Sequence, residues 1–270
     1  MVQLNAKVIE RMEFSPGSFI LRVAPDGWEL PEFKAGQYTV LGLPGSASRS
    51  PLCDPEKEPA APDKLILRAY SVASSSHAKD CVEFYITLVR SGALTARLYD
   101  LKIGDRVFLG KKFTGLMTLE NVPKEANVLL ISTGTGLAPY MSMLRTLVTS
   151  TGFDKQYAVI HGACNSWDLG YRSELETLSR MSKEFTYVPV VSEPEGELIP
   201  WKGATGFVED VWKAGAVDQA WGMHPTKDDT HIFLCGNPLM IESAIRFLGD
   251  EGFVEHTKRT PGQIHLERFW

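Results

Sequence analysis

Two short segments of this chain carry residue types that could hold and use a redox cofactor. Arg68-Ala69-Tyr70-Ser71 places a cation, a flat aromatic ring and a hydroxyl on one predicted strand. A flavin uses such groups: charge for its phosphate, a ring face to stack on, and a donor near its ring nitrogens. Further along, residues 132–139 read STGTGLAP, a glycine turn between a strand and a helix where backbone N–H groups can receive phosphates. In this order, the two segments predict a flavoenzyme that takes hydride from a nicotinamide.

The predicted strand fixes which side chains of the first segment can act together. Side chains alternate across a strand, so Arg68 and Tyr70 share one face and Ser71 points to the other. A core tyrosine beside a solvated arginine fits the same pattern. A further segment, Gly92-Ala93-Leu94-Thr95, opens a predicted short helix whose first N–H groups and threonine hydroxyl can anchor a pyrophosphate. Thr95 also fits as an ordinary first residue of that helix. The two segments together favour the flavin interpretation.

The composition narrows the class of protein. At 270 residues the chain can form two domains, and 44% hydrophobic with 23% charged residues is typical of soluble globular proteins. No apolar run approaches the roughly 20 residues that span a bilayer, and the N-terminus lacks the features of a signal peptide. We therefore expect a cytoplasmic protein without a membrane partner. The net charge of −5 gives no support for nucleic-acid binding.

The cysteines show no spacing typical of a metal site, which argues against zinc or an iron–sulfur cluster built within the chain. Scattered thiols in a cytoplasmic protein are expected to be reduced. They are Cys53, Cys81, Cys164 and Cys235.

Strand and helix patterns divide the chain into two parts. Short alternating runs up to Glu120 predict an antiparallel β-barrel with one short helix. The expected strands are Lys7–Glu13, Phe19–Val23, Tyr38–Leu41, Leu65–Val72 and Val82–Val89, with the helix near Ala93–Asp100. We expect this barrel domain to occupy residues 1–120 and to carry the predicted flavin segments.

From Asn127 onward, apolar strands alternate with helices, which predicts an α/β domain built on a parallel sheet. Its expected strands are Val128–Ile131, Tyr157–Ile160, Thr186–Val191 and His231–Cys235, and a helix is expected over Leu137–Val148. We expect this nucleotide-binding domain to occupy residues 121–270, with the boundary near Asn121–Glu125.

The segment Gly42–Lys64 differs from both patterns. It is rich in proline, serine, alanine and charge, is too long for an ordinary hairpin loop, and has no apolar period. We interpret it as a mobile surface excursion between two strands. A partner-binding segment or a lid over the flavin is the alternative.

By these motifs the chain resembles the bacterial ferredoxin (flavodoxin)–NADP⁺ reductases, within the ferredoxin-reductase superfamily. The resemblance runs along the whole chain. It is carried by FKAGQYT at 33–39, RAYS at 68–71, GALT at 92–95, TGTG at 133–136, LCGNP at 234–238 and the tail from Pro261 to Trp270. It implies a six-stranded antiparallel barrel carrying FAD, followed by a domain for a nicotinamide nucleotide.

On the flavin side, the resemblance assigns roles to three segments and the tail. In the segment Arg68-Ala69-Tyr70-Ser71, the tyrosine would stack on the flavin ring, the arginine would meet the phosphates and the serine would lie near N5. The remaining flavin contacts would come from Tyr85, Ile86, Thr87 and Leu88, and the pyrophosphate would be held by Ala93, Leu94 and Thr95. Phe269 would cover the flavin face opposite Tyr70, and Trp270 would stack near the adenine. Phe269 replaces the tyrosine of the relatives, which keeps the ring face but drops a hydroxyl.

On the nicotinamide side, Thr135-Gly136 and the helix start after them would receive the dinucleotide's phosphates. Cys235-Gly236-Asn237-Pro238 follows an apolar strand and precedes a helix, so it lies at the carboxyl edge of the sheet, where ligands bind. The missing side chain of Gly236 would admit the nicotinamide, with the Cys235 thiol near its reactive carbon. By spacing alone, Cys235 also fits as a buried residue at a strand end.

The chain departs from the family where the 2′-phosphate of NADPH would bind. The related enzymes place arginines there, because the guanidinium fork matches phosphate. Here Ala163-Cys164 and Ser192-Glu193 hold a thiol and a carboxylate, and Phe207 stands where a third arginine is often found. Arg172 and Lys202 lie nearby in the chain. Glu193 would repel a phosphate and could accept hydrogen bonds from a free ribose, so the resemblance implies NADP(H) while NAD(H) stays possible.

The implied reaction is hydride transfer between nicotinamide C4 and flavin N5, coupled to one-electron exchange with a ferredoxin or flavodoxin. Ser71 and Cys235 would lie near the reacting atoms, and Phe269 would move aside to admit the nicotinamide. The acidic partner could dock on a basic face, although its residues also fit as scattered solvated cations. These residues are Lys111, Lys112, Arg246, Lys258 and Arg259. We expect a monomer without metal.

Two other classes use the same two domains. One is an NADH-preferring reductase component of an oxygenase, or a free flavin reductase. Oxygenase reductases often carry a fused iron–sulfur domain, and no cysteine cluster supports one here. The other is a non-catalytic electron-transfer subunit, which often has a cysteine-rich insertion that this sequence lacks.

Overall fold

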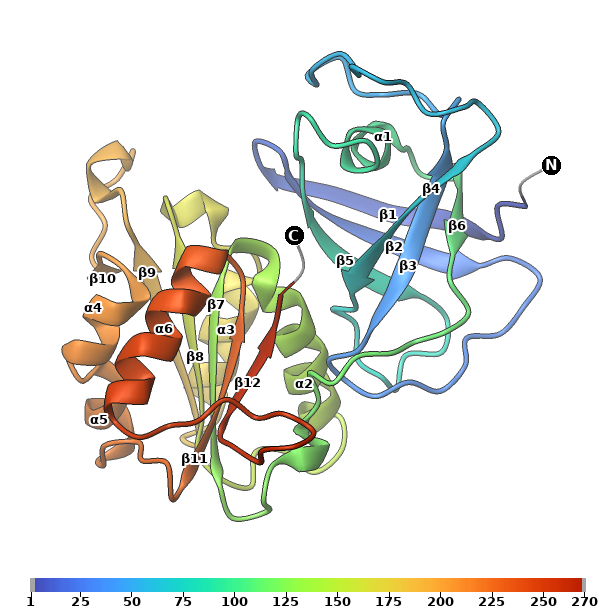
Figure 1. The fold of residues 1–270 in the computed structure, drawn as a ribbon. Coiled ribbons are helices and arrows are strands. Elements are labelled where there is room, and N and C mark those ends of the chain that lie inside the picture. The colour runs from blue at the N-terminus through green and yellow to red at the C-terminus, as the bar shows by residue number, and fades with distance from the viewer. Residues whose placement is uncertain (1–2, 269–270) are drawn as a thin grey trace. The chain divides into compact units, whose positions relative to one another are not determined.

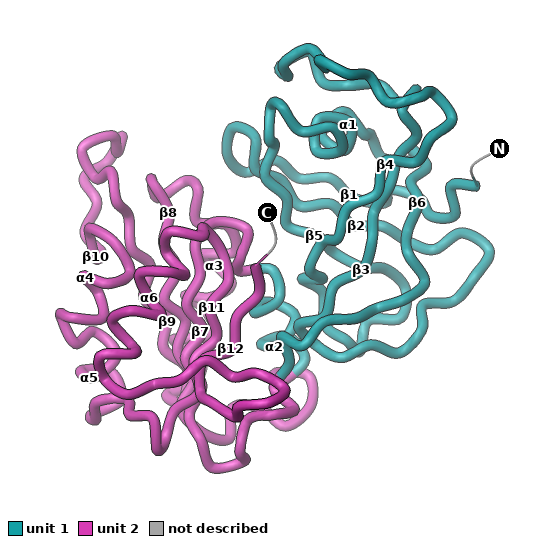
Figure 2. The backbone as a smooth tube through the Cα atoms, viewed as in Figure 1, with its two compact units in different colours: residues 1–118, 138–146 teal, residues 119–137, 147–270 magenta. Residues whose placement is uncertain are grey.

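The computed structural model describes residues 3–268, which divide into two compact units (Figure 2). One unit holds the chain up to Thr118 together with Ala138–Thr146, and the other holds Leu119–Leu137 and the chain from Leu147 onward. The chain therefore enters the second unit after Thr118, returns to the first for one helix, and leaves it again. The expected division into an FAD domain over 1–120 and a nucleotide domain over 121–270 stays a prediction.

The first unit is an antiparallel barrel (Figure 1). Its strands are β1 (Ala6–Ser15), β2 (Ser18–Pro25), β3 (Tyr38–Pro44), β4 (Leu65–Ser71), β5 (Val82–Thr87) and β6 (Arg106–Leu109). They pair in the order β4-β3-β6-β1-β2-β5, and an antiparallel bridge between Val72 and Phe84 joins the two outer strands. The predicted barrel is confirmed. The sequence patterns did not indicate β6, because its four residues begin with an exposed arginine.

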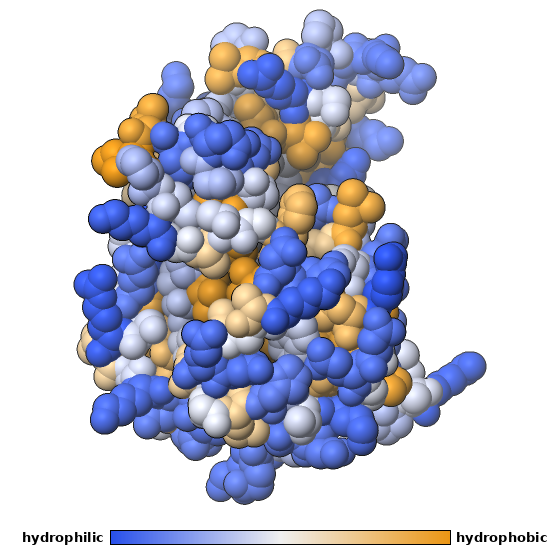
Figure 3. Space-filling view, turned by 90° about the vertical axis from the view of Figure 1, so that its left-hand side faces the viewer, coloured by the Kyte–Doolittle hydropathy of each residue, from blue (hydrophilic) through white to orange (hydrophobic). Residues whose placement is uncertain are grey.

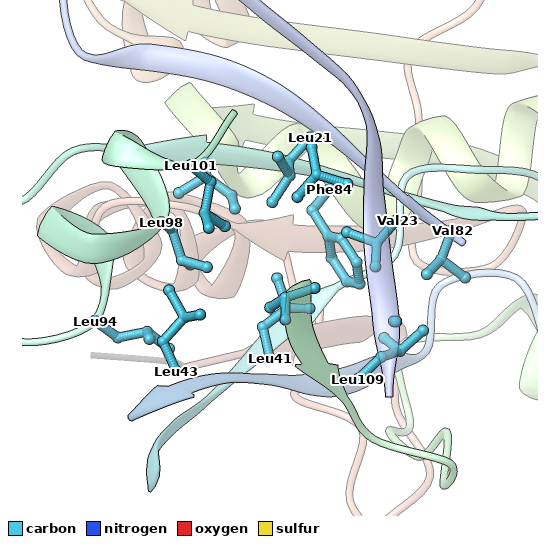
Figure 4. Packing of buried hydrophobic residues seen from close by; sticks show 14 of the residues in the cluster. Leu21, Val23, Leu41, Leu43, Val82, Phe84, Leu94, Leu98, Leu101 and Leu109 are labelled. Atoms are coloured by element: carbon cyan, nitrogen blue, oxygen red, sulfur yellow. The ribbon is translucent and has the colours of Figure 1, made fainter. Parts of the chain in front are cut away.

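Leucine, valine and phenylalanine side chains fill the barrel (Figure 4). Leu94, Leu98 and Leu101 come from α1 (Thr95–Asp100) and its flanking residues, and in Figure 4 they point toward the strand side chains. Leu94 and Leu98 are buried, as are Leu41 and Phe84 on the strands. Full burial of such a side chain stabilises a fold by roughly 1.5–3 kcal/mol. Helix α1 therefore closes one end of the barrel.

Residues 45–64 connect β3 to β4 without a strand or helix of their own. The carboxylate of Glu56 accepts hydrogen bonds from Arg97 Nη1 at 2.7 Å and Nη2 at 2.9 Å, and from Arg49 Nη1 at 3.0 Å. Arg97 lies on α1 and is 3% exposed, and its hydrogen bonds, together with its charge, lower the pKa of Glu56. A buried ion pair thus fixes this surface segment to α1. Its role as a lid or partner-binding segment stays a prediction.

Helix α2 (Ala138–Val148) is held in the first unit by the buried carboxylate of Glu83. Glu83 is 2% exposed and accepts hydrogen bonds from Arg22 Nε and Arg145 Nη1, each at 2.6 Å. Arg145 also donates to the carbonyl of Ala73 at 2.9 Å. The hydroxyl of Thr146 accepts the N–H of Ser76 at 2.9 Å. These hydrogen bonds of Glu83, Arg145 and Thr146 therefore join α2 to the region where β4 and β5 meet.

The second unit is a parallel sheet in the order β10-β9-β8-β7-β11-β12 (Figure 1). Its strands are β7 (Asn127–Thr133), β8 (Tyr157–Ala163), β9 (Phe185–Val191), β10 (Ala204–Thr205), β11 (Thr230–Cys235) and β12 (Ile264–Glu267). Every pair is parallel, so the predicted α/β sheet is confirmed. The two outermost strands, β10 and β12, were not predicted because each is too short to show a pattern.

Helices join these strands and complete the core. The α-helices are α3 (Arg172–Met181), α4 (Val208–Lys213), α5 (Ala216–Trp221) and α6 (Pro238–Asp250), and the 3₁₀ helices are η1 (Leu119–Asn121), η2 (Gly134–Leu137), η3 (Ser166–Asp168) and η4 (Pro194–Gly196). Buried side chains of α4, α5 and α6, among them Val211, Val217 and Leu248, form one core with the strands.

None of the helices in the described range 3–268 is long and apolar enough to cross a membrane. On the face drawn in Figure 3, hydrophilic side chains predominate, with smaller hydrophobic groups between them. Such a mixture is ordinary for a protein surface.

Three histidines stack beside the edge of the parallel sheet. His265 on β12 is 4% exposed, and its Nε2 lies 2.9 Å from Nδ1 of His231 on β11. Its ring also stacks on Phe233 and His256, with centroids 4.5 and 4.7 Å away. Burial, followed by the charges of the two neighbouring histidines, lowers the pKa of His265 to about 3. His265 is therefore neutral in the folded protein at physiological pH.

We predict that replacing Glu83 with glutamine lowers the free energy of unfolding by about 3 kcal/mol, because the largely buried guanidinium of Arg145 then loses the negative charge of Glu83. Urea unfolding at neutral pH measures this. Glu10→Gln is the matched control, since Glu10 binds the same Arg22 at 2.7 Å but is 45% exposed. It is expected to cost less than about 1 kcal/mol. Equal losses in the two variants would contradict the role of burial.

We also predict that His265 makes the protein less stable as pH falls. Its pKa is depressed on folding, so between about pH 6.5 and its folded value the unfolded chain binds the extra proton. Stability is full above about pH 6.5 and falls by up to about 1.4 kcal/mol per pH unit below it. His265→Phe is expected to flatten the dependence of the melting temperature on pH between about 6.5 and 4. An unchanged slope would contradict this.

The exposed His224 provides a control, because its contribution to stability changes with pH in the opposite direction. Burial lowers its pKa, but hydrogen bonds to Asp218 and Glu251 outweigh burial and raise it. Stability from this residue is therefore present at low pH and lost as pH rises through the folded pKa. His224→Gln is expected to steepen the loss of stability on acidification.

Candidate functional site

Strand β4 exposes the residues that the sequence singled out for a flavin. Leu67, Arg68 and Ala69 are all exposed, so both faces of the strand reach the surface here. Arg68 pairs with Leu41 of β3, whose side chain is buried in the barrel. Paired residues point to the same side of a sheet, so Arg68 emerges on the inward face just where the core ends. A flat ligand can therefore lie against this part of β4 without displacing the core.

Tyr70 lies on the same face as Arg68 and is half-buried. Its ring meets Phe84 edge-on, with centroids 6.4 Å apart and planes at 73°. Burial raises the pKa of the Tyr70 phenol, and the nearby charge of Arg68 partly opposes this. The tyrosine is thus a neutral ring fixed at its edge by the core. Ser71 follows, half-buried and paired with Tyr38.

In the two other flavin segments, some residues are buried or make hydrogen bonds within the fold. Tyr85 and Ile86 are buried, and the hydroxyl of Thr87 lies 3.3 Å from that of Ser18. Leu88 donates its N–H to the carbonyl of Gly17 at 2.6 Å. The exposed part of this segment therefore begins at Thr87.

At the start of α1, Thr95 closes a turn. Its hydroxyl accepts the N–H of Val89 at 3.2 Å and donates to the carbonyl of the same residue at 3.1 Å. Gly92 permits this turn, because an added Cβ would lie 2.5 Å from the Thr95 hydroxyl oxygen. Leu94 is buried and Ala93 is half-buried. In this structure Thr95 thus stabilises the turn, and its part in holding a pyrophosphate stays a prediction.

In the second unit, two glycines bring separate loops into backbone contact at the carboxyl edge of the sheet. A Cβ on Gly136 would lie 2.2 Å from the carbonyl oxygen of Cys235. A Cβ on Gly236, whose φ is +139°, would lie 2.3 Å from the Thr133 hydroxyl oxygen. Any side chain at either position would collide with the opposite loop. The predicted glycine turn and the Cys235–Pro238 segment therefore lie together where β7 and β11 end.

Hydrogen bonds lock this edge. The hydroxyl of Thr133 accepts the N–H of Asn237 at 2.8 Å, and the Asn237 side chain caps α6 by accepting the N–H of Leu239 at 2.9 Å. Asn237 and Pro238 are exposed, and Thr135 is half-exposed in the turn. Strand order reverses direction between β7 and β11, which is the position where nucleotides bind in open parallel sheets.

Cys235 ends β11 as a buried, neutral thiol. It is 8% exposed, and burial followed by the charge of Glu267 raises its pKa. Glu267 lies opposite Cys235 in the β11–β12 ladder and is 9% exposed. Glu267 was not among the residues predicted from the sequence, because only the pairing of β11 with β12 sets it beside the thiol. The short run Ile264–Glu267 near the tail was the available signal.

The segments predicted to meet the nucleotide's ribose also lie together. Ser192 donates its N–H to Ala163 at 3.0 Å, and Glu193 donates its N–H to Cys164 at 2.9 Å, extending the β8–β9 pairing past the strand ends. Cys164 and Glu193 are exposed. Burial, followed by the charge of Glu193, raises the pKa of the Cys164 thiol. Phe207 is 72% exposed just beyond β10.

The structure thus places the predicted residues in two groups, each within one unit. The first unit holds the flavin segments and the second holds the nucleotide segments. Phe269 and Trp270 lie outside the described residues, so their predicted roles stay predictions. Within the described chain, no group of histidine, cysteine and acidic side chains could hold a metal ion.

Comparison with known proteins agrees with this arrangement. Residues 57–111 match the oxidoreductase FAD-binding domain, and residues 130–246 match the oxidoreductase NAD-binding domain. The flavodoxin/ferredoxin–NADP reductase of Buchnera aphidicola subsp. Baizongia pistaciae is 29% identical over 269 residues, 99% of this chain and 98% of its own length.

A solved structure and an oxygenase component extend the comparison. The ferredoxin NADP⁺ reductase from Neisseria gonorrhoeae with bound FAD and NADP superimposes with a TM-score of 0.79 at 28% identity, covering 97% of each chain. The reductase component of phenol 2-monooxygenase from Pseudomonas sp. (strain CF600) is 30% identical over 240 residues, 88% of this chain but 58% of its own length.

A barrel for FAD and a parallel sheet for a nicotinamide nucleotide, on one chain, define a flavin-dependent oxidoreductase. The resemblance to bacterial ferredoxin (flavodoxin)–NADP⁺ reductases that the motifs of this chain indicated is confirmed.

We predict that Gly136→Ala separates the two loops of the nucleotide edge and destabilises the protein by about 1–3 kcal/mol, as overpacking does. It should also slow reduction of the bound flavin by a nicotinamide nucleotide at least about tenfold, because a shift of about 1 Å in a binding loop has effects of that size or larger. Stopped-flow absorbance and thermal unfolding measure the two effects.

The control is Gly249→Ala in α6, where an added Cβ meets nothing within 4 Å. This variant gains helix propensity and is expected to reduce its flavin at the wild-type rate. A Gly136→Ala protein that behaves like the control would contradict the close approach of the loops.

Proposed function

We propose that this protein is an FAD-dependent reductase that moves electrons between NAD(P)H and a ferredoxin or flavodoxin. One observation carries the proposal: an exposed Arg68 and a half-buried Tyr70 share one face of a barrel of the FAD-binding type, on the same chain as a glycine-lined nucleotide edge. The names of the similar proteins, several of which are flavodoxin/ferredoxin–NADP reductases, support the identity of the acceptor.

Tyr70 would present its ring to the flavin, because its edge is already fixed by Phe84 and its open face borders the exposed stretch of β4. Arg68 and Ala69 would line the phosphate end, and Ser71 would lie near N5. The remaining contacts would come from Tyr85, Ile86, Thr87, Leu88, Ala93, Leu94 and Thr95, with Phe269 and Trp270 covering the cofactor.

The nucleotide edge would hold the nicotinamide by shape and by backbone donors. Thr135 and Gly136 would bind the phosphates, and Gly236, Asn237 and Pro238 would border the nicotinamide. Cys235 would face the ring as a neutral thiol, because burial keeps it from ionising. FAD, when bound, supplies the acceptance of hydride and the release of single electrons, which no side chain of this protein offers.

The proposal includes an acidic partner, a monomer and a cytoplasmic location. Lys111, Lys112, Arg246, Lys258 and Arg259 are all exposed, so each is available to attract an acidic electron carrier. All four cysteines are free thiols, which fits a reducing compartment.

The reductase component of an oxygenase is the second candidate function. It is favoured by the 30% identity to the phenol 2-monooxygenase component, although this chain spans only 58% of that protein. The two functions differ in the protein that accepts the electrons.

The test is anaerobic mixing of the purified yellow protein with NADPH and, separately, with NADH, followed at the flavin absorption band. Bleaching by at least one nucleotide, followed by reoxidation on adding ferredoxin or flavodoxin, is the expected result. Tyr70→Ala is expected to lose most of its flavin, because one stacking face is removed, whereas Tyr70→Phe is expected to retain it. A protein that neither holds FAD nor can be reconstituted with it would overturn the proposal.

A further inference from the structure

A carboxylate of the protein itself, that of Glu197, lies where the adenosine half of a dinucleotide would meet the sheet. Glu197, on the segment after β9, reaches the residues that follow β8. Its carboxylate oxygens accept the backbone N–H of Ser166 at 2.5 Å and the Ser166 hydroxyl at 2.6 Å. A backbone N–H with a serine hydroxyl beside it is the donor set that a phosphate uses. In this chain both donors are already bound to a carboxylate of the protein.

The surrounding hydrogen bonds hold this carboxylate in place. Asn165 donates its side-chain N–H to the carbonyl of Glu193 at 3.0 Å, and Gly196 donates its N–H to the same carbonyl at 3.1 Å. With the backbone bond between Glu193 and Cys164, the loop after β9 is fixed to the loop after β8 at several points. The loop that carries Glu197 is therefore held in one position by hydrogen bonds.

Two further carboxylates act near these loops. The carboxylates of Glu193 and Asp168 both act on the Cys164 thiol and favour its protonated form. Arg172, the nearest arginine along the chain, lies over the ring of Trp201 at 4.7 Å and binds Glu176 at 2.6 Å. Its cation is thus paired with an acid of its own helix.

Parallel nucleotide-binding sheets use this position to distinguish the two nicotinamide nucleotides. The phosphates lie at the glycine turn, here after β7, and the adenosine ribose lies over the end of the next strand, here β8. An acidic side chain there accepts hydrogen bonds from a free 2′-hydroxyl, whereas an arginine accommodates a 2′-phosphate. A carboxylate can accept no hydrogen bond from a phosphate dianion and repels it.

We propose that Glu193 and Glu197 make NADH the preferred nucleotide of this enzyme. Glu193 is exposed at the end of β9 and accepts hydrogen bonds from the ribose, and Glu197 fills the donors that a 2′-phosphate would need. The inference rests on the proposed function, since it names the electron donor for the same site. Specificity of this kind is built by repelling the wrong ligand as well as by binding the right one.

The first measurement is the rate of anaerobic flavin bleaching by NADH and by NADPH across a range of concentrations, with the holoenzyme. We expect the second-order rate constant for NADH to exceed that for NADPH at least about tenfold, because like-charge juxtaposition is among the costlier mismatches in recognition. A rate constant for NADPH equal to or above that for NADH overturns the inference. Bleaching by neither nucleotide instead overturns the proposed function.

The second measurement assigns the effect to the two residues. Glu193→Gln and Glu197→Gln each remove one negative charge and keep an oxygen acceptor. Each is expected to raise the rate constant for NADPH at least about threefold relative to the rate constant for NADH. Glu195→Gln is the matched control, because Glu195 is an exposed acid of the same loop and its carboxylate does not bind Ser166. NADPH rates that rise equally in all three variants, or in none, overturn the assignment.

A binding measurement gives a readout independent of electron transfer. Inhibition of NADH-dependent bleaching by adenosine 2′,5′-bisphosphate is compared with inhibition by AMP. AMP is expected to bind the wild type more tightly, and Glu197→Gln is expected to reduce the difference between them. Tighter binding of the bisphosphate by the wild type overturns the inference.

Discussion

The nucleotide edge depends on two polypeptide backbones that touch with no side chain between them. Gly136 meets the carbonyl of Cys235, and Gly236 meets the backbone and hydroxyl of Thr133. This contact fixes the distance between the loops after β7 and β11, so the turn that offers N–H groups and the strand end that carries the thiol keep one geometry. Asn237 then caps α6 from the same place. One steric constraint thus sets both the binding loop and the start of the helix behind it.

The two units use carboxylates in opposite ways. In the first unit, Glu83 and Glu56 are each surrounded by arginines and hold surface elements on the barrel. In the second unit, the carboxylate of Glu197 is held by the backbone N–H and the hydroxyl of Ser166, which carry no charge. A carboxylate paired with a cation mainly stabilises the fold, whereas one held by neutral donors keeps its field available to act on a ligand.

Most of the fold could be predicted because its strands are long enough to show a period, as β1, β2 and β7 are. Strands β6 and β12, with four residues each, carry too little pattern. The glycine turn and Cys235 could be placed at one edge, because chain order fixes where parallel strands end. Glu197 could not be placed, because its bond to Ser166 joins residues 31 positions apart through loops without a period. Glu267 needed the register between β11 and β12, which only the packed sheet determines.

Helix α2 has a consequence for how the chain is made. The barrel unit is discontinuous, since it comprises the chain up to Thr118 together with Ala138–Thr146. Glu83 is synthesised early, but Arg145, which binds it, emerges from the ribosome after the first strand of the parallel sheet. A nascent chain that ends at β6, the last strand of the barrel, would contain Glu83 but not Arg145. The FAD-binding unit therefore reaches its final form only after synthesis of the other unit has begun.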